Sequence, residues 1–181
     1  MRHALKPHPD SACGAALGIE AEIERGSDGA VRLHFVVTGA VAGLSFPAAA
    51  TPARTDELWR HTCFELFVRP ATGAGYVEIN LSPSGEWAAY RFDGYRSGMS
   101  DLALAPPRIE TEARGDRFEL RTALALGGAA GLPADAAWQI GLSAVIEESG
   151  GRKSYWALAH PPGKADFHHP DSFALQLPAA P

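Results

Sequence analysis

Apolar and polar residues alternate along most of this chain, and this alternation constrains its fold more than any other feature. The pattern is clearest over residues 17–24, 31–38, 61–68, 76–82, 117–126 and 138–148. Successive side chains of a β-strand point to opposite faces, so a period of two indicates strands with one face toward a core. No segment shows a long 3.6-residue period, which would indicate an amphipathic helix. The chain is therefore predicted to fold from strands.

Turn signals separate these strands. They include "ATGAG" at 71–75, "PSG" at 83–85 and "SGGR" at 149–152. "SDG" at 27–29 and "RGD" at 114–116 are each interpreted as hairpin turns. Residues 127–137 are predicted to form a loop, with one helical turn as an option. About ten short strands joined in this way predict an all-β fold, an antiparallel β-sandwich of jelly-roll or immunoglobulin-like type.

Length and composition fit one globular domain. With 181 residues and no linker or repeat, we expect a single domain over 15–178, preceded by an N-terminal extension over 1–14. The net charge of −5 and the lack of a Lys/Arg run among aromatic residues argue against a nucleic-acid partner. The N-terminus has no continuous apolar segment, so we expect no secretory signal, no membrane span and a cytoplasmic location. Cys13 and Cys63 are expected to be reduced thiols.

Polar residues stand in unusual positions between Tyr76 and Arg96. Glu78 and Asn80 alternate with apolar residues there, Glu65 lies on the neighbouring predicted strand, and Arg91 follows a turn. A buried polar group must be paired, so such a set is either an internal hydrogen-bond network or a ligand cradle. Carboxylate, amide and guanidinium groups bind hydroxyls, and flat aromatic faces stack on sugar rings. The pattern is thus compatible with one wall of a binding site, and an internal network is the alternative.

The four tryptophans divide by their phase along the strands. Trp138 shares a phase with Ile140 and is predicted to be in the core. Trp59 and Trp156 are compatible with the core, which is the more frequent role of a tryptophan, or with a ligand contact. Trp87 shares a face with Arg91 and is a candidate platform for a ligand.

Two other kinds of chemistry have weaker signals. Glu65 and Glu78 resemble the carboxylate pair that glycoside hydrolysis needs. No nucleophile elbow and no phosphate-binding glycine loop is present. The cluster of His160, Asp166, His168 and His169 does not match a compact zinc signature, so we expect no metal site, although one of these histidines could serve a ligand site.

Three segments carry a resemblance to a known family. "LWRHTCFELFVRP" (58–70), "YVEINLSPSGEWAAYRFDGYR" (76–96) and "SYWALAHPPGKADFHHPDSF" (154–173) resemble the DOMON-like superfamily, which includes the family nine carbohydrate-binding modules. Within it, the chain looks most like a stand-alone bacterial group. The resemblance covers about residues 15–178. It implies a β-sandwich that binds a sugar or haem without catalysing a reaction.

The resemblance also implies site residues. In the sugar-binding relatives tryptophans clamp the terminal sugar, and Trp59 and Trp156 occupy clamp positions here. In the haem-binding relatives Met and His are axial ligands, which would be Met99 with His160 or His169. Those relatives are usually secreted or membrane-tethered, and this chain shows no export signal.

The sequence therefore predicts a non-catalytic domain that binds a small ligand, with a sugar as the leading ligand and no resident cofactor. The alternatives are a haem-binding domain, a protein-interaction β-sandwich and a sugar-active enzyme that uses Glu65 and Glu78. The oligomeric state stays open. The residues predicted to contact the ligand are Trp59, Glu65, Glu78, Asn80, Trp87, Arg91, Trp156 and His160.

Overall fold

Thirteen β-strands pair into one continuous sheet in the computed structural model, which describes residues 2–27, 29–127 and 132–179. Every pairing between these strands is antiparallel. The elements are β1 (Arg2–Pro7), β2 (Ala16–Arg25), β3 (Ala30–Gly39), η1 (Val41–Gly43), β4 (Leu44–Ser45), η2 (Leu58–Arg60), β5 (Cys63–Pro70), β6 (Tyr76–Leu81), β7 (Trp87–Phe92), β8 (Ser100–Asp101), β9 (Glu110–Arg114), β10 (Arg117–Ala125), β11 (Trp138–Glu148), β12 (Lys153–Ala157), η3 (Pro170–Ser172) and β13 (Leu175–Leu177).

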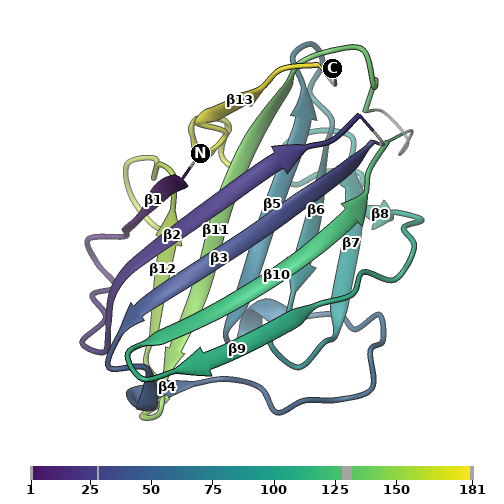
Figure 1. Cartoon of the computed structure of the whole chain (residues 1–181). Coiled ribbons are helices and arrows are strands. Elements are labelled where there is room, and N and C mark those ends of the chain that lie inside the picture. Colours follow the sequence, from purple (N-terminus) through teal and green to yellow (C-terminus); the bar gives the residue numbers. More distant parts are fainter. Residues whose placement is uncertain (1, 28, 128–131, 180–181) are drawn as a thin grey trace.

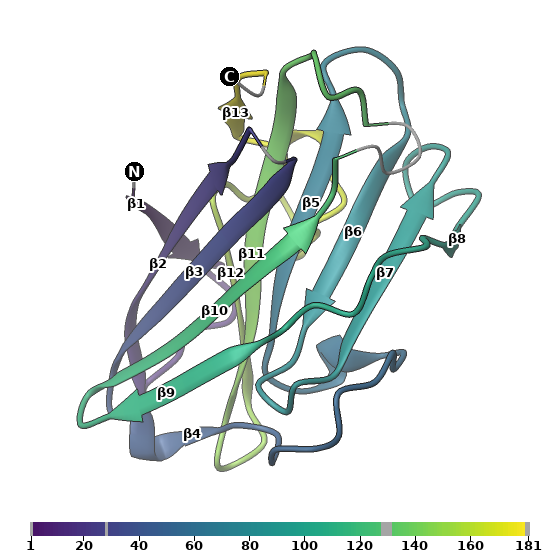
Figure 2. The same ribbon diagram turned by 45° about the vertical axis from the view of Figure 1, so that its right-hand side comes forward.

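The sheet folds over on itself into two layers. Its strand order is β8-β7-β6-β5-β11-β12-β1-β2-β3-β10-β9, with β4 and β13 also paired to β11. In Figure 1, β2, β3, β10 and β9 cross in front of the other strands, and Figure 2 shows the two sets from the side. We call β2, β3, β10 and β9 the front layer, and β8, β7, β6, β5, β11 and β12 the back layer. Strand β1 joins them, because it pairs with β2 along Arg2–Leu5 and with β12 at Lys6 and Pro7.

The main core lies between the two layers. Phe35 of β3 packs on Phe64 of β5, with ring centroids 5.1 Å apart, and Phe118 of β10 stacks on the same Phe64 at 6.0 Å. Leu66 and Ile79 of the back layer are also fully buried in this core. Burying one such side chain contributes about 1.5–3 kcal/mol relative to leaving it exposed. The apolar side chains of the alternating pattern therefore form the core that holds the two layers together.

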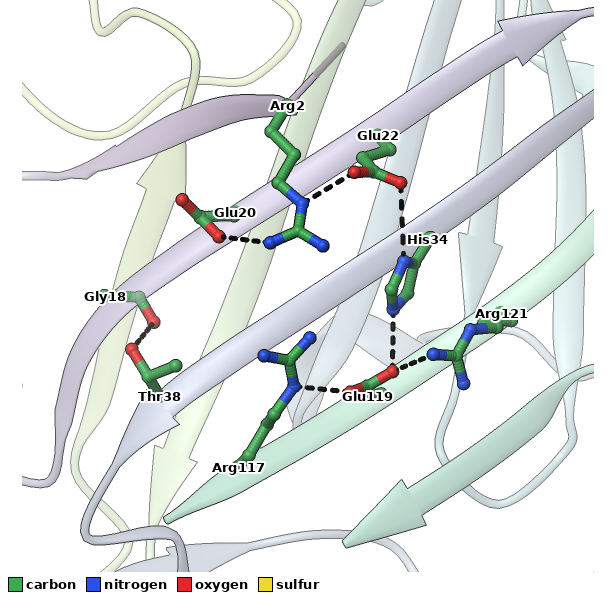
Figure 3. A network of polar contacts seen from close by, with 9 residues as sticks. All are labelled: Arg2, Gly18, Glu20, Glu22, His34, Thr38, Arg117, Glu119 and Arg121. Atoms are coloured by element: carbon green, nitrogen blue, oxygen red, sulfur yellow. Dashed lines mark hydrogen bonds and ion pairs between the residues drawn. The ribbon is translucent and has the colours of Figure 1, made fainter. Parts of the chain in front are cut away.

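The outer face of the front layer is polar and its charges are paired. Arg2 Nε donates to Glu22 Oε1 at 2.6 Å, and His34 Nε2 lies 2.8 Å from Glu119 Oε2. Arg117 and Arg121 also bind Glu119, so the contacts run across four strands (Figure 3). The exposed pairs of Arg2 contribute little, about 0–1 kcal/mol each, whereas the side chain of Glu119 is only 12% exposed beneath its partners. This face is an ordinary solvated surface.

The outer face of the back layer is different, because it carries a second apolar cluster. Cys63 and Phe67 of β5, Tyr76 of β6 and Tyr90 of β7 are buried there, together with Phe167 from the loop after β12. Strands β5 and β6 therefore have apolar contacts on both faces. None of the helices in the described part of the chain has the length and apolarity needed to cross a membrane.

The predicted all-β antiparallel class is confirmed, while the strand count is higher than the predicted ten. Strands β4 and β8 have only two residues each, too few to show a period. Strand β1 lies within residues 1–14, which we expected to be an extension, and only its Leu5 is buried, so it shows no alternation. The jelly-roll or immunoglobulin-like type stays a prediction.

The turn predictions have mixed outcomes. The RGD tripeptide forms the turn between β9 and β10, where Arg114 pairs with Arg117 and Gly115 has a φ of +57°. Asp28 of the predicted "SDG" turn lies outside the described residues. The same holds for residues 128–131 of the predicted loop at 127–137.

Gly39 closes β3 in a conformation that other residues avoid. Its φ is +137°, and a Cβ there would lie 2.2 Å from the Ala15 carbonyl oxygen. We expect Gly39→Ala to lower the free energy of unfolding by at least about 1–3 kcal/mol, because backbone strain adds to this clash. Urea denaturation measures the loss. Gly150→Ala is the control, since nothing lies within 4 Å of its added Cβ, and it should change stability by less than about 0.5 kcal/mol. Equal losses in both variants would contradict the steric argument.

Candidate ligand-binding pocket

A pocket of about 510 Å³ opens on the outer face of the back layer. This volume lies within the range of small-molecule sites. Side chains from the strands form its floor, and three segments without regular strand structure form its walls: η2, the loop after β7 and the loop after β12. The strand residues are Glu65, Glu78, Tyr90, Phe92, Val145, Lys153 and Tyr155, and the wall residues are Trp59, Arg60, Arg96, Met99, Ala165, Phe167 and His168.

Strand register brings the two floor carboxylates together. Glu65 of β5 pairs with Asn80 of β6, and Phe67 pairs with Glu78, so Glu65 and Glu78 are diagonal neighbours on one face. Diagonal neighbours lie roughly 7–8 Å apart between Cα atoms. Only 3% of Glu65 and 6% of Glu78 is exposed. Two carboxyl groups thus lie side by side in a largely apolar face.

A neutral side chain donates a hydrogen bond to one oxygen of each carboxylate. Ser143 Oγ of β11 donates to Glu65 Oε2 at 3.2 Å, and Asn80 Nδ2 donates to Glu78 Oε1 at 2.8 Å. His168 Nε2 lies 3.8 Å from Glu78 Oε2. Within the described residues, no Lys or Arg forms an ion pair with either carboxylate. The site therefore lacks the usual partner of a buried acid.

Burial shifts the protonation of these groups. It raises the pKa of Glu78 to about 7. Burial also raises the pKa of Glu65 well above its usual range, and the neighbouring Glu78 adds to this effect. Burial lowers the pKa of His168 to about 4, and the positive charge of Arg96 contributes. Near neutral pH the pair therefore holds at least part of its protons, and His168 is neutral.

An ion pair joins two of the wall segments. Arg96, in the loop after β7, has a φ of +50° and donates from Nη2 to Asp166 Oδ1 at 2.8 Å. The hydroxyl of Tyr95 also binds Asp166. Asp166 Oδ1 accepts from the His168 backbone N–H at 3.1 Å, which positions that residue in the wall. This contact sets the width of the pocket between the two loops.

The mouth of the pocket carries exposed apolar side chains. Trp59 of η2 is 41% exposed and Met99 is 62% exposed, although both line the pocket. Leu58 is buried and anchors η2 to the back layer. Below the mouth, the Tyr90 hydroxyl donates to Asp56 Oδ1 at 2.6 Å. Large apolar groups that stay exposed around a concave site are typical of ligand contact surfaces.

Three of the predicted ligand residues line this pocket: Trp59, Glu65 and Glu78. Asn80 lies on the same face, but it is fully buried and acts through its hydrogen bond to Glu78. The predicted grouping of these polar residues on one face agrees with the register. Their contact with a ligand stays a prediction.

The predicted roles of Trp87 and Trp156 need correction. Both are about 95% buried in the core between the layers, where no ligand can stack on them. Trp156 Nε1 donates to Ser154 Oγ at 2.9 Å. Along β12, Tyr155 faces the pocket and Trp156 faces the core, so Trp59 and Trp156 do not form a clamp. Trp138 is fully buried, as predicted.

Arg91 and His160 also lie away from the pocket. Arg91 pairs in register with Val77, a core residue, so it is on the opposite face of the back layer from Glu78. His160 Nε2 lies 2.9 Å from the Lys6 carbonyl oxygen, and its ring packs on His8.

The haem alternative loses its predicted ligand pair. Met99 lines the pocket, whereas His160 and His169 do not. His169 Nδ1 instead accepts from the Asp171 backbone N–H at 3.2 Å. No group of three or more metal-ligating side chains is found in the described part of the chain.

Sequence reasoning missed several pocket residues. Tyr90 pairs with Glu78 in register, so the strand phase carried a signal for it. Tyr155 had the same kind of signal, as the neighbour of Trp156 with the opposite phase. Arg96 and Phe167 come from loops, where the sequence has no period. His168 belongs to the histidine cluster from which one site residue was considered.

The titration of Glu78 gives a testable effect on stability. Between pH 4.5 and about 7 the folded protein holds a proton that the unfolded chain has lost, so stability falls as the pH rises through this window. The raised pKa corresponds to a loss of about 3 kcal/mol in the free energy of unfolding across this window. We expect Glu78→Gln to be as stable as the wild type near pH 4 and more stable near pH 8, by up to that amount. Urea denaturation at each pH measures the difference.

Glu148→Gln provides a control of opposite sign. The hydrogen bond from Arg152 is the main cause that lowers the pKa of Glu148 to about 2. This variant should therefore be less stable than the wild type near pH 7, and the deficit should shrink as the pH falls toward 2. If the stability difference between Glu78→Gln and the wild type does not change with pH, burial does not raise the pKa of Glu78.

Comparisons with known proteins inform on the fold. No family model matches the chain, and no curated protein matches it. One similar solved structure is a candidate carbohydrate-binding protein from Bacteroides uniformis, 12% identical, with a TM-score of 0.65 over 95% of this chain and 83% of that chain. Another is a family 9 carbohydrate-binding module from Caldicellulosiruptor kristjanssonii in complex with cellotriose, 10% identical, with a TM-score of 0.52 over 90% of this chain and 74% of that chain. At these identities the likeness shows that the chain shares their all-β fold.

Proposed function

We propose that this protein binds a carbohydrate in the pocket on the outer face of the back layer and does not alter it chemically. One observation carries the proposal: a concave site of about 510 Å³ combines aromatic side chains with buried polar groups that have free hydrogen-bonding capacity. Such a combination suits a ligand with flat apolar faces and hydroxyl edges. A cytoplasmic location remains part of this proposal.

The lining offers both kinds of contact that a sugar needs. Trp59, Tyr90 and Tyr155 provide aromatic surface, and Glu65 and Glu78 provide polar groups at the floor. A protonated carboxyl donates one hydrogen bond and accepts others, so a pair that holds part of its protons can match both the hydrogen and the oxygen of a hydroxyl. Hydrogen bonds made away from water inside the pocket are the ones that orient a ligand.

Structural neighbours support the proposal at the level of the fold. One of them is described as a candidate carbohydrate-binding protein, and the other is a carbohydrate-binding module that holds cellotriose. A fold alone does not determine a ligand. The support is therefore an analogy, and the residues of the pocket carry the chemistry.

The same carboxylates favour binding over hydrolysis. Hydrolysis of a glycosidic bond requires one carboxyl that keeps its proton and one that is ionised. Burial instead raises the pKa of both Glu65 and Glu78, that of Glu78 to about 7, so neither carboxyl is held fully ionised near neutral pH. This is the physical reason for proposing a binding protein and not a sugar-active enzyme.

The exposed Trp59 allows a direct test. We expect the wild type to be stabilised in a thermal-shift screen by at least one mono- or disaccharide. We expect Trp59→Ala to weaken that binding at least about tenfold in calorimetry, because truncating a tryptophan that anchors a ligand typically costs about 2 kcal/mol or more, and about 1.4 kcal/mol is tenfold. The fold should remain intact, since Trp59 is 41% exposed.

Two further variants separate stacking from packing. Leu17→Ala removes an apolar side chain that is 81% exposed and lies outside the pocket lining, and it should leave sugar binding unchanged. Trp156→Ala should instead lower the free energy of unfolding by about 3–5 kcal/mol, because it leaves a cavity in the core. If no sugar stabilises the wild type, or if Trp59→Ala binds as well as the wild type does, the proposal is wrong.

A further inference from the structure

Glu65 and Glu78 present carboxyl oxygens without a hydrogen-bond donor to the pocket. Their hydrogen bonds come from the neutral groups of Ser143 and Asn80 and use one oxygen of each carboxylate. Among the described residues, no group donates to Glu65 Oε1, and His168 Nε2 lies 3.8 Å from Glu78 Oε2. Both residues are more than nine-tenths buried. Buried acids without a cation nearby are costly, and a bound cation would relieve that cost.

The cations of the pocket lining do not fill this role. Arg96 is paired with Asp166 at 2.8 Å, and Arg60 is paired with Glu57 at 2.8 Å. His168 is neutral near pH 7, because burial lowers its pKa to about 4. The charge of Arg96 acts to lower the pKa of both floor carboxylates, but Arg96 forms its ion pair with Asp166 and not with either of them.

Lys153 is a further lining cation, and it lies at a different level of the pocket. It pairs in register with Glu147 of β11, whereas Glu65 pairs with Ser143 of the same strand. These levels are four residues apart, roughly 13 Å along the strand. Lys153 is partly exposed, and it forms no ion pair with either floor carboxylate among the described residues. The pocket thus has a positive rim and a negative floor.

Aromatic rings add to the negative character of the site. Trp59, Tyr90, Tyr155 and Phe167 line the pocket together with the two carboxylates. The face of an aromatic ring is electron-rich and attracts a cation, and rings beside a carboxylate form a recurrent setting for ammonium recognition.

We propose that the preferred ligand is an amino sugar, whose primary ammonium group binds between the carboxylates of Glu65 and Glu78 while its ring contacts the aromatic walls. This inference rests on the proposed carbohydrate-binding function of the same pocket. An ammonium has three N–H donors and no acceptor, which suits two carboxylate oxygens that lack donors. A neutral hydroxyl can donate one hydrogen bond, but it leaves the two acids without a counter-charge.

Binding of the ammonium is coupled to a proton. Because burial raises the pKa of Glu78 to about 7, the pair holds part of its protons near neutral pH, and a bound cation favours the ionised form. Binding of the amino sugar should therefore release a proton that binding of a neutral sugar does not release.

The charged and titratable groups around the pair are Cys63, Tyr76, Tyr90, Arg96, Arg60, Lys153, Tyr155, Asp166 and His168.

The other shifted groups do not titrate in the same range. Burial raises the pKa of Cys63 well above its usual value and that of Tyr76 to about 12. A proton released near pH 7 is therefore assigned to the carboxylate pair, because the amine of glucosamine, which titrates roughly in the α-amino range of about 7.7–8.0, can only take up a proton on binding as an ammonium.

Titration calorimetry on the full chain near pH 7 tests the inference with three matched ligands. D-glucosamine carries the ammonium, D-glucose has a hydroxyl in its place, and N-acetyl-D-glucosamine has a neutral amide there. We expect glucosamine to bind at least about tenfold more tightly than the other two. Repeating the titration in two buffers with different ionisation enthalpies should show proton release for glucosamine and none for glucose.

Variants assign the effect to the carboxylates. Glu78→Gln should remove the preference for glucosamine over glucose and abolish proton release. Glu65→Gln is the second variant if the first does not fold, as judged by circular dichroism. Glu110→Gln changes an exposed glutamate of β9 outside this pocket and should leave the preference intact.

Each other result is also decisive. If glucose or N-acetylglucosamine binds as tightly as glucosamine, the inference is overturned and the proposed carbohydrate function stands. If cyclohexylamine binds as tightly as glucosamine and glucose does not bind, the site recognises an ammonium outside a sugar, which overturns both. If none of these compounds binds, both proposals also fail.

Discussion

Burial of the back layer on both faces is the constraint on which the rest of the structure depends. Every residue of β6 is buried, and so are the first six residues of β5. One face, with Phe64 and Ile79, packs against the front layer. The other face is covered by η2 and by the loops after β7 and β12. A polar side chain on that second face does not reach bulk water and must find its partner within the protein or in a ligand.

The front layer shows what the same alternation produces under ordinary conditions. Along β10 each buried residue is followed by one that is partly or fully exposed, and Glu119 meets Arg117, Arg121 and His34 on a solvated surface (Figure 3). Arg117 and Arg121 are partly exposed and supply the positive charges that pair with Glu119. The carboxylates of β5 and β6 differ from Glu119 in their surroundings and not in their sequence pattern. Because η2 and the loops after β7 and β12 cover Glu65 and Glu78, ionising these side chains is costly.

This difference explains which predictions came from the sequence and which did not. Alternation is local, so it predicted the strands and the shared face of Glu65, Glu78 and Asn80. It did not tell which face of β12 is the core face, because Tyr155 and Trp156 are both aromatic and neighbours. Burial of Trp156 follows from packing against the front layer, which is distant in sequence.

Periodicity could not predict the walls of the pocket either, because they depend on contacts between loops that are distant in the sequence. The contact between Arg96 and Asp166 joins residues 70 positions apart, both in loops. Strand β1 was missed because a strand that bridges two layers buries only one of its side chains, Leu5. Its position depends on backbone pairing with β2 and β12, and the side-chain pattern does not indicate such pairing.

The sequence left open whether the polar residues of the back layer form an internal network or a ligand cradle. The structure shows the network, and the proposed cradle would use the carboxylate oxygens that this network leaves free. Asn80 and Ser143 each bind one carboxylate oxygen from beside it, which fixes the orientation of Glu78 and Glu65. The second oxygen of each carboxylate has no donor among the described residues. A network built for stability alone would satisfy both oxygens or replace the acids by apolar side chains, since an incompletely paired buried acid lowers stability. Supporting residues that hold a carboxylate and leave one of its oxygens free are the arrangement that a preorganised binding site requires.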